Sequence, residues 1–140
     1  DEKLVFSAPF DEEDFTAASG GGTILLDAEI TALEVFREQL FVFTENSIFL
    51  VAGSTVADFQ LQPVTRDVGC VARDTVREIG GDVMFLGPDG LRLLSATERI
   101  NDFGLAVVSK PIQSELTELI TVSTSFTAVL IRPKSQYRLL

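Results

Sequence analysis

The sequence contains no histidine and no tryptophan, and only one cysteine, one methionine and one tyrosine. Without histidine, a Ser-His-Asp or Cys-His catalytic site cannot form, and neither can a histidine-based metal site. The single cysteine, Cys70, excludes an intrachain disulfide. It stands between apolar neighbours, Gly69 and Val71, which predicts a buried and unreactive thiol rather than a nucleophile.

Basic side chains are scarce: 11 Lys and Arg stand against 21 Asp and Glu, which gives a formal net charge of −10. Binding of a phosphate backbone needs clustered basic residues that displace counterions. No such cluster is present, so we expect no direct binding to nucleic acid. Long apolar runs are also missing. The longest, Ile48–Ala52, is far shorter than the ~20 residues that a membrane-spanning helix requires, so we expect no membrane partner.

Apolar residues, by contrast, are plentiful. They make up 46% of the 140 residues and include eleven phenylalanines. This length suits one domain with a hydrophobic core. Because β-branched and aromatic residues dominate the apolar positions, the composition predicts an all-β fold.

The most informative feature is an internal repeat. Ala32–Phe43 aligns with Thr75–Leu86 without gaps, at an offset of 43 residues. Each copy contains an amphipathic strand, a tight polar turn, a continuously apolar strand, a second turn and a third strand. In the second copy, Pro88-Asp89-Gly90 is a strong turn signal, because proline presets φ and glycine accepts a positive φ. We therefore predict two equivalent antiparallel meanders.

A third, truncated copy is predicted near the end of the sequence. Val129–Ile131 matches the middle strand and Tyr137–Leu140 the third strand, with one extra residue between them. Leu40–Phe43, Val83–Leu86 and Val129–Ile131 are thus expected to be equivalent buried strands. In the first copy, Val56–Val64 is expected to add a fourth strand.

A period of ~43 residues with three or four strands is typical of a β-propeller blade. The alternative is a chance similarity between hairpins of a β-sandwich. A closed propeller needs at least about four blades, so we expect an oligomer or a fragment of a longer chain. The predicted division of the single module 1–140 is a partial unit at 1–29, repeats at 30–68 and 69–109, a helical insert at 110–120 and a truncated repeat at 121–140.

Two segments depart from the β pattern. After Ser109 and Pro111, which are suited to a helix cap and first turn, apolar residues recur along one helical face, so we expect a short helix at 111–120. The acidic run Asp11–Asp14 has oxygen ligands that suit Ca²⁺, but it lacks the spacing of a calcium loop. A solvated turn is the alternative, and we favour it.

No residue is assigned a catalytic, cofactor-binding or metal-binding role from the sequence. Gly20–Thr23 lacks the Gly-Lys-Ser/Thr of a phosphate-binding loop and is predicted to be a flexible turn. Acidic residues are abundant enough for a carboxylate pair. Nothing in their spacing distinguishes such a pair from solvated surface, so we expect no enzyme and no cofactor.

Several turn-and-strand phrases resemble virion proteins of tailed bacteriophages, namely large tail, nozzle or connector components with propeller-like repeats, common among marine phages. The phrases are Lys3–Pro9, Glu13–Phe15, Ile30–Leu33, Val68–Val71, Asp82–Leu86, Pro88–Arg92 and Ser135–Leu139. The resemblance implies a structural, non-enzymatic role in the virion, after assembly in the host cytoplasm. The partners it implies are other virion proteins or further copies of the chain.

An alternative from another class is a host-facing propeller that binds glycans or proteins. Glycan sites use exposed aromatic rings beside polar groups, whereas tryptophan is absent here and most phenylalanines fall at core-like positions. A hydrolase or lyase on a propeller scaffold is a third possibility. The sequence therefore favours the structural role.

Overall fold

The computed structural model describes residues 1–95 and 107–140. Their strands form four antiparallel sheets. The α-helix α2 (Gln113–Val122) lies among short 3₁₀ turns, of which η2 (Arg73–Thr75) and η4 (Arg132–Lys134) matter below. The prediction of an all-β fold with one short helix is confirmed. The strands are β1 (Lys3–Phe6), β2 (Gly22–Leu25), β3 (Ile30–Phe36), β4 (Gln39–Thr44), β5 (Ile48–Ala52), β6 (Gln60–Thr65), β7 (Arg77–Ile79), β8 (Asp82–Gly87), β9 (Gly90–Leu93), β10 (Ala128–Ile131) and β11 (Gln136–Leu139).

The two predicted meanders are present and share one register. The first sheet has the order β3-β4-β5-β6, and the second has the order β7-β8-β9. Val42 pairs with Phe49 in the first, and Phe85 pairs with Arg92 in the second, 43 residues later in both strands. The middle strands β4 and β8 are therefore equivalent, as the repeat predicts.

The fourth strand of the first meander is also present. It is β6, at the end of the segment predicted for it. In the second meander Val107 forms an antiparallel bridge with Arg92 on the free side of β9, so it occupies the position of β6. The second sheet has three named strands, and this single bridge lies where β6 lies in the first.

The first turn of each meander has the same left-handed geometry but different residues. Arg37 and Glu38 have φ values of 50° and 63°, and Gly80 and Gly81 have values of 59° and 80°. Two positive φ values define the type I′ turn that suits the twist of a hairpin. Glycine adopts them freely, whereas a side chain costs roughly 1–2 kcal/mol per residue. The Arg37 guanidinium donates to the carbonyl oxygen of Gly81 at 3.1 Å and links the two turns.

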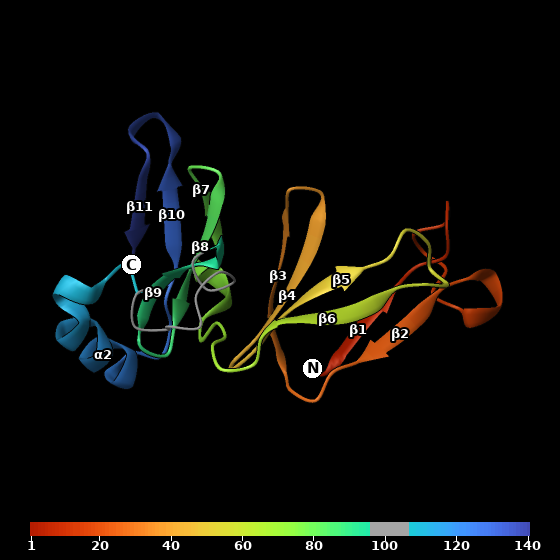
Figure 1. Cartoon of the computed structure of the whole chain (residues 1–140), viewed down its shortest axis with the longest axis horizontal. Helices are drawn as coiled ribbons and strands as arrows, with labels where there is room; N and C mark the ends of the chain where they lie inside the picture. Colours follow the sequence, from red (N-terminus) through yellow and green to blue (C-terminus); the bar gives the residue numbers. More distant parts are fainter. Residues whose placement is uncertain (96–106) are drawn as a thin grey trace.

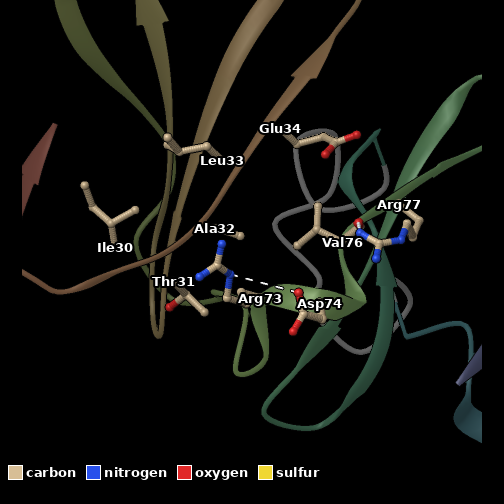
Figure 2. Close-up of a pocket in the computed structure, with 9 residues that line it drawn as sticks. All are labelled: Ile30, Thr31, Ala32, Leu33, Glu34, Arg73, Asp74, Val76 and Arg77. Carbon is tan, nitrogen blue, oxygen red and sulfur yellow. Dashed lines mark hydrogen bonds and ion pairs between the residues drawn. The ribbon is translucent and has the colours of Figure 1, made fainter. Parts of the chain in front are cut away.

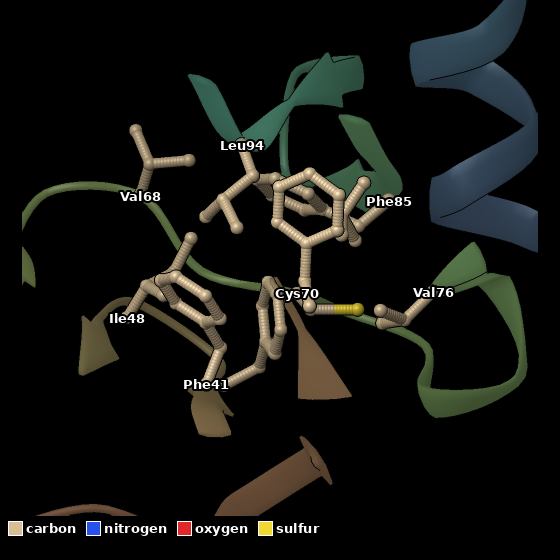
Figure 3. Close-up of a cluster of buried hydrophobic side chains, with 10 residues drawn as sticks. Phe41, Ile48, Val68, Cys70, Val76, Phe85 and Leu94 are labelled. Carbon is tan, nitrogen blue, oxygen red and sulfur yellow. The ribbon is translucent and has the colours of Figure 1, made fainter. Parts of the chain in front are cut away.

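The main core lies between the two meanders (Figure 3). Phe41 and Phe43 point from one face of the first meander, and Val83 and Phe85 point toward them from the second. The rings of Phe43 and Phe85 are 5.3 Å apart and inclined by 59°. Because side chains alternate along β4, Val42 points to the opposite face.

A smaller core lies on that opposite face. Leu4 and Leu26, from the hairpin β1–β2 and its end, pack with Val42 and Phe49. β1 and β2 pair in antiparallel fashion. In Figure 1, β1 runs in the direction of β5, and β2 in the direction of β6. The partial unit predicted at 1–29 therefore resembles the last two strands of a meander.

The hairpin β10–β11 has a different place in the repeat from the predicted one. In Figure 1 the hairpins β3–β4, β7–β8 and β10–β11 project in the same direction, and β10 packs beside β7. β10 and β11 are therefore the first and middle strands of a third unit, and the prediction that Val129–Ile131 is a middle strand is wrong. Its burial is wrong too, since Val129 is 45% exposed.

The helix lies close to its predicted position, with different contacts. Leu116 is buried, whereas Ile112 and Leu119 are exposed, so the expected apolar face is not buried as a whole. Ser109 does not cap the helix: its hydroxyl oxygen accepts a hydrogen bond from the Leu91 amide at 3.0 Å. The position before α2 is Ile112. Ser109 thus ties the chain to β9 instead.

A buried ion pair closes the turn between β8 and β9. Arg92 is 2% exposed and donates two hydrogen bonds to the carboxylate of Asp89, at 2.9 and 2.5 Å. Removal of the acid leaves a buried charge without its partner. Since Asp89 itself is 40% exposed and water can partly replace it, we expect Asp89→Ala to cost about 2–3 kcal/mol.

Chemical denaturation of the variant measures this loss. The matched control is Asp74→Ala, because Asp74 pairs with Arg73 at 4.0 Å on the surface. An exposed pair contributes about 0–1 kcal/mol. Equal losses in the two variants would contradict a structural role for the buried pair.

Candidate interaction surface

A groove of about 350 Å³ separates β3 from the segment η2–β7 (Figure 2). It exists because β3 and β7 are edge strands of neighbouring sheets, so no further strand fills the space between them. Figure 2 shows Glu34 on the β3 side, with the Leu33 side chain turned away from it, and Arg73, Asp74 and Arg77 on the side of η2–β7. The groove has charged side chains of both signs at its rim.

Glu34 is a partly buried acid in the wall of this groove. Its partial burial raises the pKa, the positive charge of Arg77 opposes the rise, and Glu78 adds to it. A carboxyl group in such a setting is suited to accept a proton. Neither a serine nor a cysteine lines the groove, so its described residues include no hydroxyl or thiol nucleophile of these types.

A second groove, of about 420 Å³, separates β7 from β10. Glu34 and Arg77 line it as well, together with Glu78 and Arg132. The Arg77 guanidinium donates to the carbonyl oxygen of Ala128 at 3.1 Å and to that of Val76 at 2.8 Å. Arg77 therefore joins the second and third units, and much of its hydrogen-bonding capacity serves the fold.

Cys70 lies inside the main core and is fully buried. Burial raises the pKa of its thiol, while contacts with Ala72 and Thr75 oppose the rise. A thiol in this state is a poor nucleophile. The predicted burial of Cys70 is confirmed.

The acidic run Asp11–Asp14 forms a solvent-exposed turn. Hydrogen bonds from Ser19 and Thr16 lower the pKa of Asp14. Within residues 1–95 and 107–140 no three metal-binding side chains of the His, Cys, Asp and Glu types come together. In the same residues, no helix is long and apolar enough to cross a membrane.

Tyr137 connects the third unit to the second. Its hydroxyl group donates to the carbonyl oxygen of Thr75 at 2.7 Å. Burial raises the pKa of the phenol above its ordinary value, and the neighbouring Cys70 adds to the rise. In the unfolded chain the phenol ionises at about pH 10, while in the folded chain it stays neutral to a higher pH. The stability that this group contributes is therefore present below about pH 10 and falls as the pH rises further.

This gives a pH-dependent prediction. We expect Tyr137→Phe to lose about 1 kcal/mol at neutral pH, through the missing hydrogen bond. Above about pH 10 the variant should lose less stability than the native chain. Urea denaturation of both proteins between about pH 8 and pH 11 measures the difference between their free energies of unfolding. The titration of groups that both proteins share cancels in this difference. Parallel curves would contradict the buried phenol.

Exposed apolar side chains gather where the units lack a neighbour. Leu33 and Val35 of β3 are 49% and 64% exposed, and Val129 and Leu140 of the third unit are 45% and 73% exposed. Apolar positions on a strand are read from the sequence as core. Their exposure becomes visible only once the arrangement of the units is known.

The sequence matches no family model, and no curated protein shows significant similarity to it.

Proposed function

We propose that this chain is a structural, non-enzymatic module, and that it works within the tail or connector of a bacteriophage particle. The observation that carries the structural role is the packing of equivalent meanders, in one register, face to face along the chain. Such a contact can be repeated with further units, as assembly proteins require. The setting in a phage rests on the resemblance of the turn-and-strand phrases.

The surface chemistry agrees with this role. Charged residues of both signs line the grooves, while Cys70 is buried. A net charge of −10 gives a surface that repels a passing DNA chain. This property suits the wall of a conduit.

Mass spectrometry of purified phage particles tests the proposal. Trypsin releases the segment 78–92, because Arg77 precedes it and Arg92 ends it. We expect digests of sedimented, intact particles to contain this peptide, in amounts proportional to those of the major tail proteins. Its presence only in the soluble part of the lysate would overturn the assignment to the virion.

One observation favours the host-facing binding module as a second candidate. Phe10 is fully exposed, with a φ of 65°, and Phe15 is 51% exposed on the same loop. Exposed aromatic rings are common anchors in recognition. Binding to glycans or to host-cell extracts that Phe10→Ala abolishes, without a change in thermal stability, would favour this candidate.

A further inference from the structure

The units pack in one direction. Val42 and Phe85 are equivalent at the 43-residue offset, and each faces the element that precedes its own meander. Val42 faces β1–β2, and Phe85 faces the first meander. A head-to-tail contact of this kind continues until a ring closes or a filament forms.

The hairpin β1–β2 covers only part of the face on which it packs. Leu33 lies on the same face as Val42, because the two residues are directly paired. Leu33 is 49% exposed, whereas its equivalent in the second meander, Val76, is 2% exposed. The first meander buries Val76. Among the described residues, no hairpin equivalent to β3–β4 precedes the first meander and covers Leu33.

The hairpin β10–β11 lacks the other half of a four-stranded unit. It supplies the first and middle strands of a unit, and among the described residues no third or fourth strand pairs with β11. Ala128 is buried on the side that faces the second meander, while Val129 and Arg138 lie on the outward side. The two ends of the module are thus two different halves of one four-stranded unit.

We propose that a second copy of the chain completes both halves. β1–β2 of one copy joins β10–β11 of the other into a four-stranded sheet, with the free edges of β1 and β11 side by side. The outward face of β10–β11, including Val129, then covers Leu33 and Val35 of the other copy, as the first meander covers Val76. Free strand edges favour this pairing, because they carry unpaired N–H and C=O groups.

Counting the units sets the size of the assembly. The described residues of one copy form two meanders and two half-units, which together make three units. Propellers close with about four to eight blades, so the described residues of one copy supply too few units and those of three copies too many. Two copies give six. The proposal is therefore a two-chain, six-bladed ring, and it does not depend on a setting in a phage particle.

Light scattering on the purified chain tests the ring. We expect a mass of about twice the 15.2 kDa of the chain. Val35→Asp and Val129→Asp, on the two complementary surfaces, should each reduce the mass to that of a monomer. Val122→Asp is the matched control, because Val122 is a 69% exposed valine on α2, away from both surfaces. Circular dichroism shows whether each variant is folded.

Cross-linking tests the head-to-tail geometry. One preparation carries Glu2→Cys, just before β1 and on the same face as Leu4, and another carries Arg138→Cys on the outward face of β11. The two are refolded together, and a short bis-maleimide is added after refolding. Cys70 does not interfere, since it is fully buried. We expect cross-linked dimers in the mixture and not in either variant alone.

Three results would overturn the proposal: a native monomer, a dimer that survives both aspartate substitutions, or cross-links within a single variant. None of these results affects whether the tryptic segment 78–92 is found in phage particles. The ring and the assignment to a phage can therefore fail separately.

Discussion

Phe85→Ala is expected to destabilise the fold by about 3–5 kcal/mol, the range for removing a buried phenylalanine. Phe85 is fully buried and packs against Phe43 with a ring separation of 5.3 Å. The substitution leaves a cavity between the two meanders, and their backbones cannot collapse into it, because each is held by its own ladder of hydrogen bonds. The stability of a small domain is only about 5–15 kcal/mol, so the loss is a large part of the total.

Urea denaturation measures this loss, and Phe15→Ala is the matched control. Phe15 is 51% exposed and belongs to no core cluster of the described residues, so its removal should change the stability by about 0.5 kcal/mol or less. Phe85→Leu should fall between the two. A loss below about 1 kcal/mol for Phe85→Ala would show that the two meanders are stable independently of their shared core.

The sequence predicted the two meanders because their signals are local. The apolar pattern repeats at 43 residues, and the turns are short enough to set the pairing of their strands. The Pro-Asp-Gly turn between β8 and β9 lies where it was predicted. The repeat in sequence therefore became a repeat in register, as Val42 and Phe85 show.

The third unit could not be placed from sequence because its signals fit two positions in the meander. Two apolar strands separated by a four-residue turn resemble both the first and middle strands and the middle and third strands. Only the direction of β10, set by its packing beside β7, distinguishes them. Two hydrogen bonds hold the third unit in this position. Tyr137 of the third unit donates to Thr75, and Arg77 of the second unit donates to Ala128.

The sequence also gave no sign of the buried charge or of the grooves. Arg92 occupies the position equivalent to Phe49, where a repeat predicts an apolar residue. Its partner, Asp89, looked like an ordinary turn residue. The grooves arise between the edge strands of separate sheets, and this relationship is tertiary. Candidate sites of this kind follow from packing and not from motifs.

Gly69→Ala is expected to be as damaging as the loss of Phe85, for a different reason. The segment around Gly69 crosses from the first meander to the second. The backbone amide of Cys70 donates to the carbonyl oxygen of Thr44 at 2.8 Å, and the backbone amide of Val71 donates to the carbonyl oxygen of Leu86 at 2.9 Å. These two bonds hold the meanders together through their backbones.

A methyl group on Gly69 has no room. Its carbon would lie 2.1 Å from the carbonyl oxygen of Thr44 and 2.4 Å from the amide nitrogen of Asn46. Both are backbone atoms, so no side chain can rotate away to relieve the contact. The segment must shift, with an overpacking cost of about 1–3 kcal/mol and the loss of a buried hydrogen bond worth about 1–3 kcal/mol more. We therefore expect a total loss of roughly 2–6 kcal/mol.

Gly80→Asn is the control that separates crowding from the general effect of replacing a glycine. Gly80 has a positive φ of 59°, and no atom lies within 4 Å of the place where its Cβ would stand. Asparagine tolerates this conformation better than other side chains, so the loss should be about 1 kcal/mol or less. Urea denaturation of the two variants decides the matter. If Gly69→Ala were as stable as Gly80→Asn, the close backbone contact that joins the meanders would not exist in solution.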